Sequence, residues 1–171
     1  TTDECRERVR AFRRRVPRGA MRTVVPASLA RWSDQEFEDS LAFVREMAFS
    51  RLHVFRYSPR PGTVALHLPG QVSPEVAKER SQKMRDLGRT LAKSYHQGFV
   101  GRVVPVLFEN HTDGEWSGLT GSYVRASVPE EGDLHNRIAP IRCTSADERG
   151  IRGELVTSES APVDTAEAPI G

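Results

Sequence analysis

The chain has 171 residues, 37% of them apolar and 28% charged, which is ordinary for a water-soluble globular protein of one or two domains. No run approaches the roughly 20 apolar residues of a membrane helix, and the start lacks a signal-peptide core, so we expect a cytoplasmic protein without membrane contact. Residues 1–98 hold 19 Lys and Arg against 11 Asp and Glu, whereas residues 99–171 hold 6 against 12. The basic part could hold a polyanion such as RNA, although solvated arginine-rich helix faces are the commoner reason for such a charge.

The first quarter of the chain predicts two helices. Apolar residues recur every three or four positions from Cys5 to Val16, and Pro17 would close that helix. A second helix begins at Ser33, because Ser-Asp-Gln-Glu36 has the pattern of a capping box. Its buried face would carry Phe37, Leu41, Val44 and Ala48.

A strand and a long helix follow. Apolar and polar residues alternate over Arg51–Tyr57, which predicts a strand, and a helix followed by a strand indicates an α/β unit. The Pro- and Gly-rich run Ser58–Gly62 opens a loop that reaches about Val72. Ser73 then caps a helix that ends by Gly98. This helix carries the basic residues Lys78, Arg80, Lys83, Arg85, Arg89 and Lys93.

The character of the chain changes at Phe99. Short β-prone runs at Val103–Phe108, Ser122–Val128 and Ile138–Cys143 are separated by Asp-Gly, Gly-Ser and Glu-Gly turn signals. This spacing predicts a small all-β barrel of about five strands that ends near Val156. Residues 157–171 have almost no large apolar side chain, so we expect them to be disordered.

Four stretches, in order along the chain, resemble a known family. They are Phe49–Thr63 with its Pro-Arg-Pro-Gly-Thr loop, Gln71–Arg80, Gly118–Arg125 and Ile151–Val156. They resemble the carboxy-terminal part of the MiaB and MtaB transfer-RNA methylthiotransferases, which are radical S-adenosylmethionine enzymes. The resemblance implies an α+β fold. Residues 1–72 would be helix–strand units left from a radical SAM partial barrel, 73–98 a basic connecting helix, 99–156 an OB-like TRAM barrel, and 157–171 a tail.

The resemblance also implies a function in RNA modification. The sequence around His53 and the Gly-Leu-Thr-Gly-Ser-Tyr motif resemble the MtaB branch more than MiaB. The MtaB branch methylthiolates N6-threonylcarbamoyladenosine next to the anticodon. The TRAM barrel would bind the anticodon stem-loop of the tRNA.

The cofactor motif of the family is missing from this sequence. Such enzymes need a Cys-x-x-x-Cys-x-x-Cys run for the four-iron four-sulfur cluster that binds S-adenosylmethionine, and this chain has only Cys5 and Cys143. We therefore expect no cofactor, no metal and no catalytic residue here, and no activity without the missing amino-terminal portion of the enzyme. The alternatives are a freestanding RNA-binding module without catalysis and the product of a degraded gene without function. An upstream reading frame that encodes the cluster cysteines would support the enzyme, and its absence would leave the other two.

Candidate RNA-binding residues follow from side-chain chemistry. Tyr123 and Arg125, two positions apart, would share one face of a strand, where the ring can stack on a base and the guanidinium can reach a phosphate. A tyrosine packed into the barrel beside a solvated arginine is an equally good reading. Because the barrel is acidic, we expect Arg102, Lys93 and Arg89 near the basic helix to share the contact.

Other polar residues carry weaker signals. By resemblance, the end of the predicted strand faces the reacting centre of the enzyme. The candidates for contact with the substrate at this edge are Arg56, Tyr57, Ser58 and Arg60. A structural role, with Arg60 in a surface turn, is an equally good interpretation. The histidines are scattered without ligand spacing, so we expect packing or surface roles for His53, His67, His96, His111 and His135.

One segment departs from the family pattern. Where the family has Gly-Phe-Pro-Gly-Glu after a strand, this chain has Pro26-Ala-Ser-Leu-Ala-Arg-Trp32. Codons exist for Ala27 to Trp32 whose shifted frame spells the family sequence. A local frameshift over residues 23–32 is therefore one hypothesis, and ordinary divergence of a loop is the other. The genomic codons decide between them.

Overall fold

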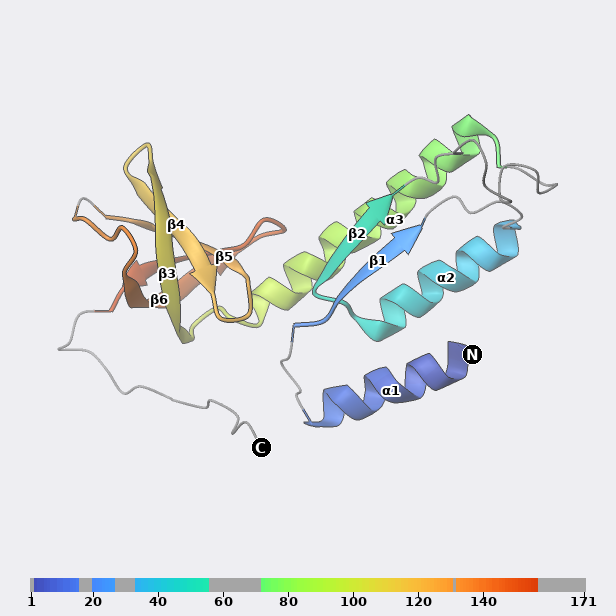
Figure 1. Cartoon of the computed structure of the whole chain (residues 1–171), viewed down its shortest axis with the longest axis horizontal. Helices are drawn as coiled ribbons and strands as arrows, with labels where there is room; N and C mark the ends of the chain where they lie inside the picture. The colour runs from blue at the N-terminus through green and yellow to red at the C-terminus, as the bar shows by residue number, and fades with distance from the viewer. Residues whose placement is uncertain (1, 16–19, 27–32, 56–71, 131, 157–171) are drawn as a thin grey trace. The chain divides into compact units, whose positions relative to one another are not determined.

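A computed structural model describes residues 2–15, 20–26, 33–55, 72–130 and 132–156. The chain divides into two compact units, residues 1–12 with 21–91 and residues 13–20 with 92–171. Each unit has its own cluster of buried apolar side chains. The expected α+β class, in which helices and strands are joined to a small closed barrel, is confirmed (Figure 1).

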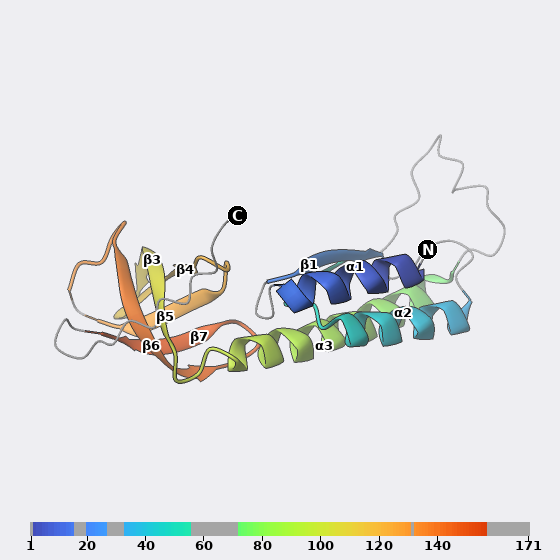
Figure 2. The same ribbon diagram turned by 90° about the horizontal axis from the view of Figure 1, so that it is seen from below.

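Two helices open the first unit, α1 (Thr2–Arg15) and α2 (Asp34–Met47). Arg10 and Arg6 of α1 both donate to the carboxylate of Glu46 on α2, at 2.5 Å and 3.0 Å. The guanidinium of Arg10, with that of Arg6, holds the pKa of the Glu46 carboxyl below its ordinary value. These ion pairs join α1 to α2 where the two helices run side by side (Figure 2).

The start of α2 is the predicted capping box. The backbone N–H of Glu36 donates to Oγ of Ser33 at 3.2 Å, and the N–H of Ser33 donates to Oε2 of Glu36 at 2.7 Å. The expectation for the other end was wrong, because Ala48 ends the helix in a left-handed conformation with φ 48°. Its side chain is therefore exposed, and Met47 completes the buried face that begins at Phe37.

The strands β1 (Arg22–Pro26) and β2 (Arg51–Phe55) pair in parallel. On one face Val25 is buried and its register partner Val54 is half-buried in the core of the first unit. The other face is open to solvent, since the side chains of Val24 and Phe55 are 62% and 48% exposed. The strand predicted from Arg51 is confirmed as far as the structure describes it.

The long helix α3 (Pro74–Gln97) is confirmed with its cap, where the N–H of Val76 donates to Oγ of Ser73 at 3.3 Å. Met84 is fully buried in the core of the first unit. One of the basic residues is not solvated: Arg80 is 6% exposed, donates to Asp34 at 2.6 Å and lies over the ring of Phe37. Arg80 therefore stabilises the packing of the first unit and does not add to an exposed basic surface of α3.

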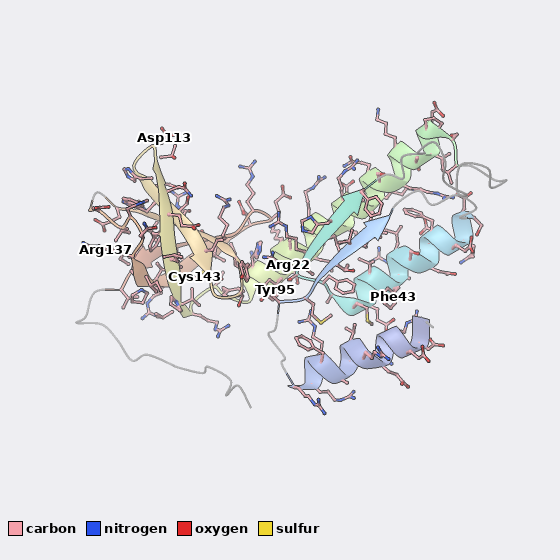
Figure 3. All side chains as sticks on the ribbon, viewed as in Figure 1. Arg22, Phe43, Tyr95, Asp113, Arg137 and Cys143 are labelled. Carbon is pink, nitrogen blue, oxygen red and sulfur yellow. The ribbon has the colours of Figure 1, made fainter. Side chains whose placement is uncertain are left out.

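The second unit contains the predicted five-stranded barrel, closed in the order β3-β4-β5-β7-β6. The strands are β3 (Val103–Thr112), β4 (Glu115–Thr120), β5 (Arg125–Pro129), β6 (Ile138–Ala146) and β7 (Ile151–Leu155). Inward side chains alternate along each strand, as period-two packing requires. The fully buried ones include Val106, Phe108, Val128, Ile141 and Cys143, and Figure 3 shows Cys143 within the barrel.

The last turn of α3 belongs to this barrel. The ring of Tyr95 packs edge-on against Phe99 with centroids 5.4 Å apart. His96 is buried, with Nδ1 2.7 Å from the backbone oxygen of Asp147, and Nε2 of Gln97 donates to the backbone oxygen of Ala146 at 3.2 Å. The barrel core is thus closed on one side by helical residues that precede the first strand.

Candidate functional site

Tyr123 lies in the tight turn between β4 and β5, and not in a strand. Its backbone has φ 59°, the left-handed region, and its N–H donates to the backbone oxygen of Thr120 at 2.8 Å. The N–H of Val124 donates to Oγ1 of the buried Thr120 at 3.1 Å, which ties the turn to the barrel wall. The expectation that Tyr123 and Arg125 share a strand face was therefore wrong, because β5 begins only at Arg125.

The turn holds the ring of Tyr123 outside the barrel. The residue is 66% exposed, so the reading in which it packs the core is excluded. A left-handed conformation in a residue with a bulky side chain costs on the order of 1 kcal/mol, and such strain is commonest at functional positions. The anchored turn thus presents a flat aromatic surface to solvent.

Arg125 is exposed at the start of β5 and borders a cavity of about 530 Å³ on the barrel. The cavity lies among the first half of β5, the end of β6, the β6–β7 turn and the start of β7. Its lining includes two further arginines, Arg149 and Arg152, that sequence reasoning missed. Their only sequence signal is positive charge, which many surface residues share.

The three remaining RNA-binding candidates lie on α3 or directly after it. Arg102 is half-buried, with its guanidinium 5.7 Å from the ring centroid of Phe99, and its backbone oxygen accepts the N–H of Cys143 at 2.9 Å. Lys93 is exposed on α3 in the second unit. Arg89 is in the first unit and pairs with Asp86 one helical turn before it. The substrate-edge candidates Arg56, Tyr57, Ser58 and Arg60 all lie outside the described residues, as do Ala27 to Trp32 and the tail from Thr157.

The cysteines do not fit an iron–sulfur cluster. Cys143 is 1% exposed in the barrel core, and burial raises the pKa of its thiol, which disfavours the thiolate that binds iron. The sequence has one other cysteine, Cys5, so three thiolates cannot come from this chain. Among the described residues, no group of three His, Cys, Asp or Glu side chains could hold a metal ion.

No helix in the described ranges is both long and apolar enough to cross a membrane.

Comparison with known proteins gives relatives over most of the chain. It is 32% identical over 162 residues to the ribosomal protein uS12 methylthiotransferase RimO of Syntrophotalea carbinolica, covering 90% of this chain and 36% of the relative. It is 28% identical over 156 residues to the tRNA-2-methylthio-N(6)-dimethylallyladenosine synthase of Aquifex aeolicus, covering 91% and 36%. The synthase of the same name from Geobacillus kaustophilus is 32% identical over 160 residues, covering 91% and 30%. No family model matches the chain. The chain spans about a third of the length of these relatives.

Proposed function

Since the chain is related over nine tenths of its length to methylthiotransferases, we propose that its barrel is the part of such an enzyme that holds tRNA. The observation that carries the proposal is the exposed ring of Tyr123 in a strained, anchored turn next to Arg125. An aromatic ring stacks on any unpaired base, and such a contact is worth about 1–3 kcal/mol. A neighbouring guanidinium adds a phosphate contact.

The reaction we propose is methylthiolation of tRNA, with N6-threonylcarbamoyladenosine next to the anticodon as the target nucleoside. The likeness of the Gly118–Tyr123 motif to the branch with that substrate supports the choice. The chain has too few cysteines for the cluster, so the iron–sulfur chemistry would come from a polypeptide segment with three cysteines. Such an enzyme would work in the cytoplasm. If no such segment accompanies the chain, the barrel acts as a freestanding RNA-binding module.

The test is a titration of labelled anticodon stem-loop RNA with the wild-type chain and two variants at position 123. Tyr123→Ala removes the ring and should weaken binding about 5- to 150-fold, the factor that corresponds to about 1–3 kcal/mol. Tyr123→Phe keeps the stacking surface and should bind within about twofold of wild type. Equal affinity of Tyr123→Ala and wild type would show that the barrel turn does not contact the RNA.

A second candidate function rests on the charge of the barrel segment. Residues 99–156 hold 9 Asp and Glu against 6 Lys and Arg, a balance suited to a basic protein partner, and one relative is named for its action on ribosomal protein uS12. A basic, arginine- and lysine-rich protein would then bind the barrel more tightly at low salt than the stem-loop does. The same titration with such a protein in place of RNA decides between the candidates.

A further inference from the structure

The cavity beside Arg125 has a layout of its own, separate from the turn that holds Tyr123. On the outer surface of the barrel, the register places Arg152 of β7 between Ser127 of β5 and Ser145 of β6. Two serines therefore flank Arg152 in the register of three neighbouring strands. Arg125 and Arg149 also line the cavity, so three arginines border one cavity with a volume of about 530 Å³.

The charges of this surface are only partly balanced by the protein. Arg152 pairs with Glu115, whereas Arg125 and Arg149 form no ion pair within the described residues. The carboxylate of Asp147 also lines the cavity, but its Oδ1 accepts the backbone N–H groups of Arg149 at 2.7 Å and Gly150 at 3.0 Å. These bonds, that to Arg149 first, and the nearby guanidinium charge of Arg149 hold the pKa of the Asp147 carboxyl below its ordinary value, so one negative charge lies beside the three arginines of the cavity.

Close packing of the backbone brings the arginines together. Gly150 is buried, and a Cβ at this position would lie 2.2 Å from the backbone oxygen of Arg125. Only a residue without a side chain lets the β6–β7 turn approach the start of β5 so closely. The turn that carries Arg149 is thereby held against the strand that carries Arg125, although the two residues are far apart in sequence.

We infer that this cavity binds phosphodiester groups of the RNA strand whose base stacks on Tyr123. Guanidinium groups bind phosphate oxygens in a bidentate manner, and serine hydroxyls add neutral donors, which are the groups proteins commonly use for phosphate. The barrel is otherwise acidic, so it has no broad basic surface to attract the RNA backbone. The cavity would instead fix the path of the RNA strand at one place. The inference rests on the proposed function, because it assigns the phosphate contacts of the same RNA.

The experiment uses the full chain and labelled anticodon stem-loop RNA at several salt concentrations. Arg149→Ala should lower affinity about tenfold in low salt and reduce the slope of log affinity against log salt by roughly 0.7–0.9. Arg149→Lys keeps the charge but not the fork of donors, so it should keep the slope and recover only part of the affinity. The matched control is Arg137→Ala, which removes an exposed arginine that does not line the cavity and is labelled in Figure 3.

A second readout needs no RNA. Replacing chloride by inorganic phosphate at constant ionic strength should shift the side-chain Nε–Hε NMR signals of Arg125 and Arg149 more than that of Arg137. If Arg149→Ala and Arg137→Ala change affinity and slope alike, the inference is wrong, while weaker binding by Tyr123→Ala would leave the proposed function standing. If wild type binds no RNA, the proposed function fails and this inference with it. Phosphate shifts without any RNA binding would identify a site for free phosphate and overturn the assignment to RNA.

Discussion

Replacing Gly150 by alanine should destabilise the barrel where β5 pairs with β7, the strand pair with the fewest register partners. The added Cβ would lie 2.2 Å from the oxygen of the Arg125 carbonyl, more than 1 Å inside the usual contact distance of about 3.5 Å, and 3.0 Å from its carbon. Both atoms belong to the backbone, so no side chain can rotate away. The seam between β5 and β7 has only the register pairs Ala126–Ile151 and Ser127–Arg152 to resist the displacement.

The expected loss is about 2 kcal/mol in the free energy of unfolding, which for a domain of this size corresponds to roughly 8–16 °C in Tm. Urea unfolding followed by the fluorescence of Trp116, buried in the barrel, reports on this unit. Trp32→Phe makes Trp116 the sole tryptophan, since the sequence has two. Gly121→Ala is the control, because nothing lies within 4 Å of a Cβ there. If both alanine variants unfold at the same urea concentration, the close approach at Gly150 does not limit the barrel.

Three further outcomes follow from the structure. Ser33→Ala should cost about 1 kcal/mol by removing one half of the capping box, measured by far-UV circular dichroism in urea. Burial raises the pKa of Cys143, so the folded state keeps the thiol proton to higher pH than the unfolded state does, and the free energy of unfolding should fall as pH rises above about 8.5. A Cys143→Ala variant whose stability falls equally over that pH range would refute this. A fragment that starts at Ala92 should unfold at higher urea than one that starts at Phe99, since only the first retains Tyr95; equal midpoints would mean that the helix end adds nothing to the barrel.

Local signals in the sequence predicted the helices, β2 and the barrel, whereas β1 and β4 were not predicted individually. The capping box at Ser33 and the cap at Ser73 each involve residues within four positions, so their outcome depends little on the rest of the chain. Short β-prone runs separated by turn signals predicted the barrel, because each strand of such a barrel is brief and ends at a local turn. The left-handed end at Ala48 was missed, since alanine gives no sign of such a conformation.

The candidate site was predicted only in part, for a physical reason. The exposure of Tyr123 depends on a turn anchored by the Oγ1 of Thr120, whereas the sequence run from Ser122 reads as continuous strand. Arg149 joins Arg125 only through the parallel pairing of β5 with β7, which no local pattern reveals. Contacts between distant strands therefore decided the part of the site that sequence reasoning missed.

The open face of the parallel pair β1–β2 bears on how the protein behaves in concentrated solution. Val24 and Phe55 give that face an apolar surface on which a second copy could stack, which is a route to aggregation. At one end of the same face Arg22 and Arg51 are register partners, and both are exposed. Two copies that stacked face to face with their strands in the same direction would bring these like charges together, so the arginines would oppose that arrangement. Salt screens such repulsion, and the chain should therefore be least soluble in high-salt buffers, in which many proteins are routinely purified.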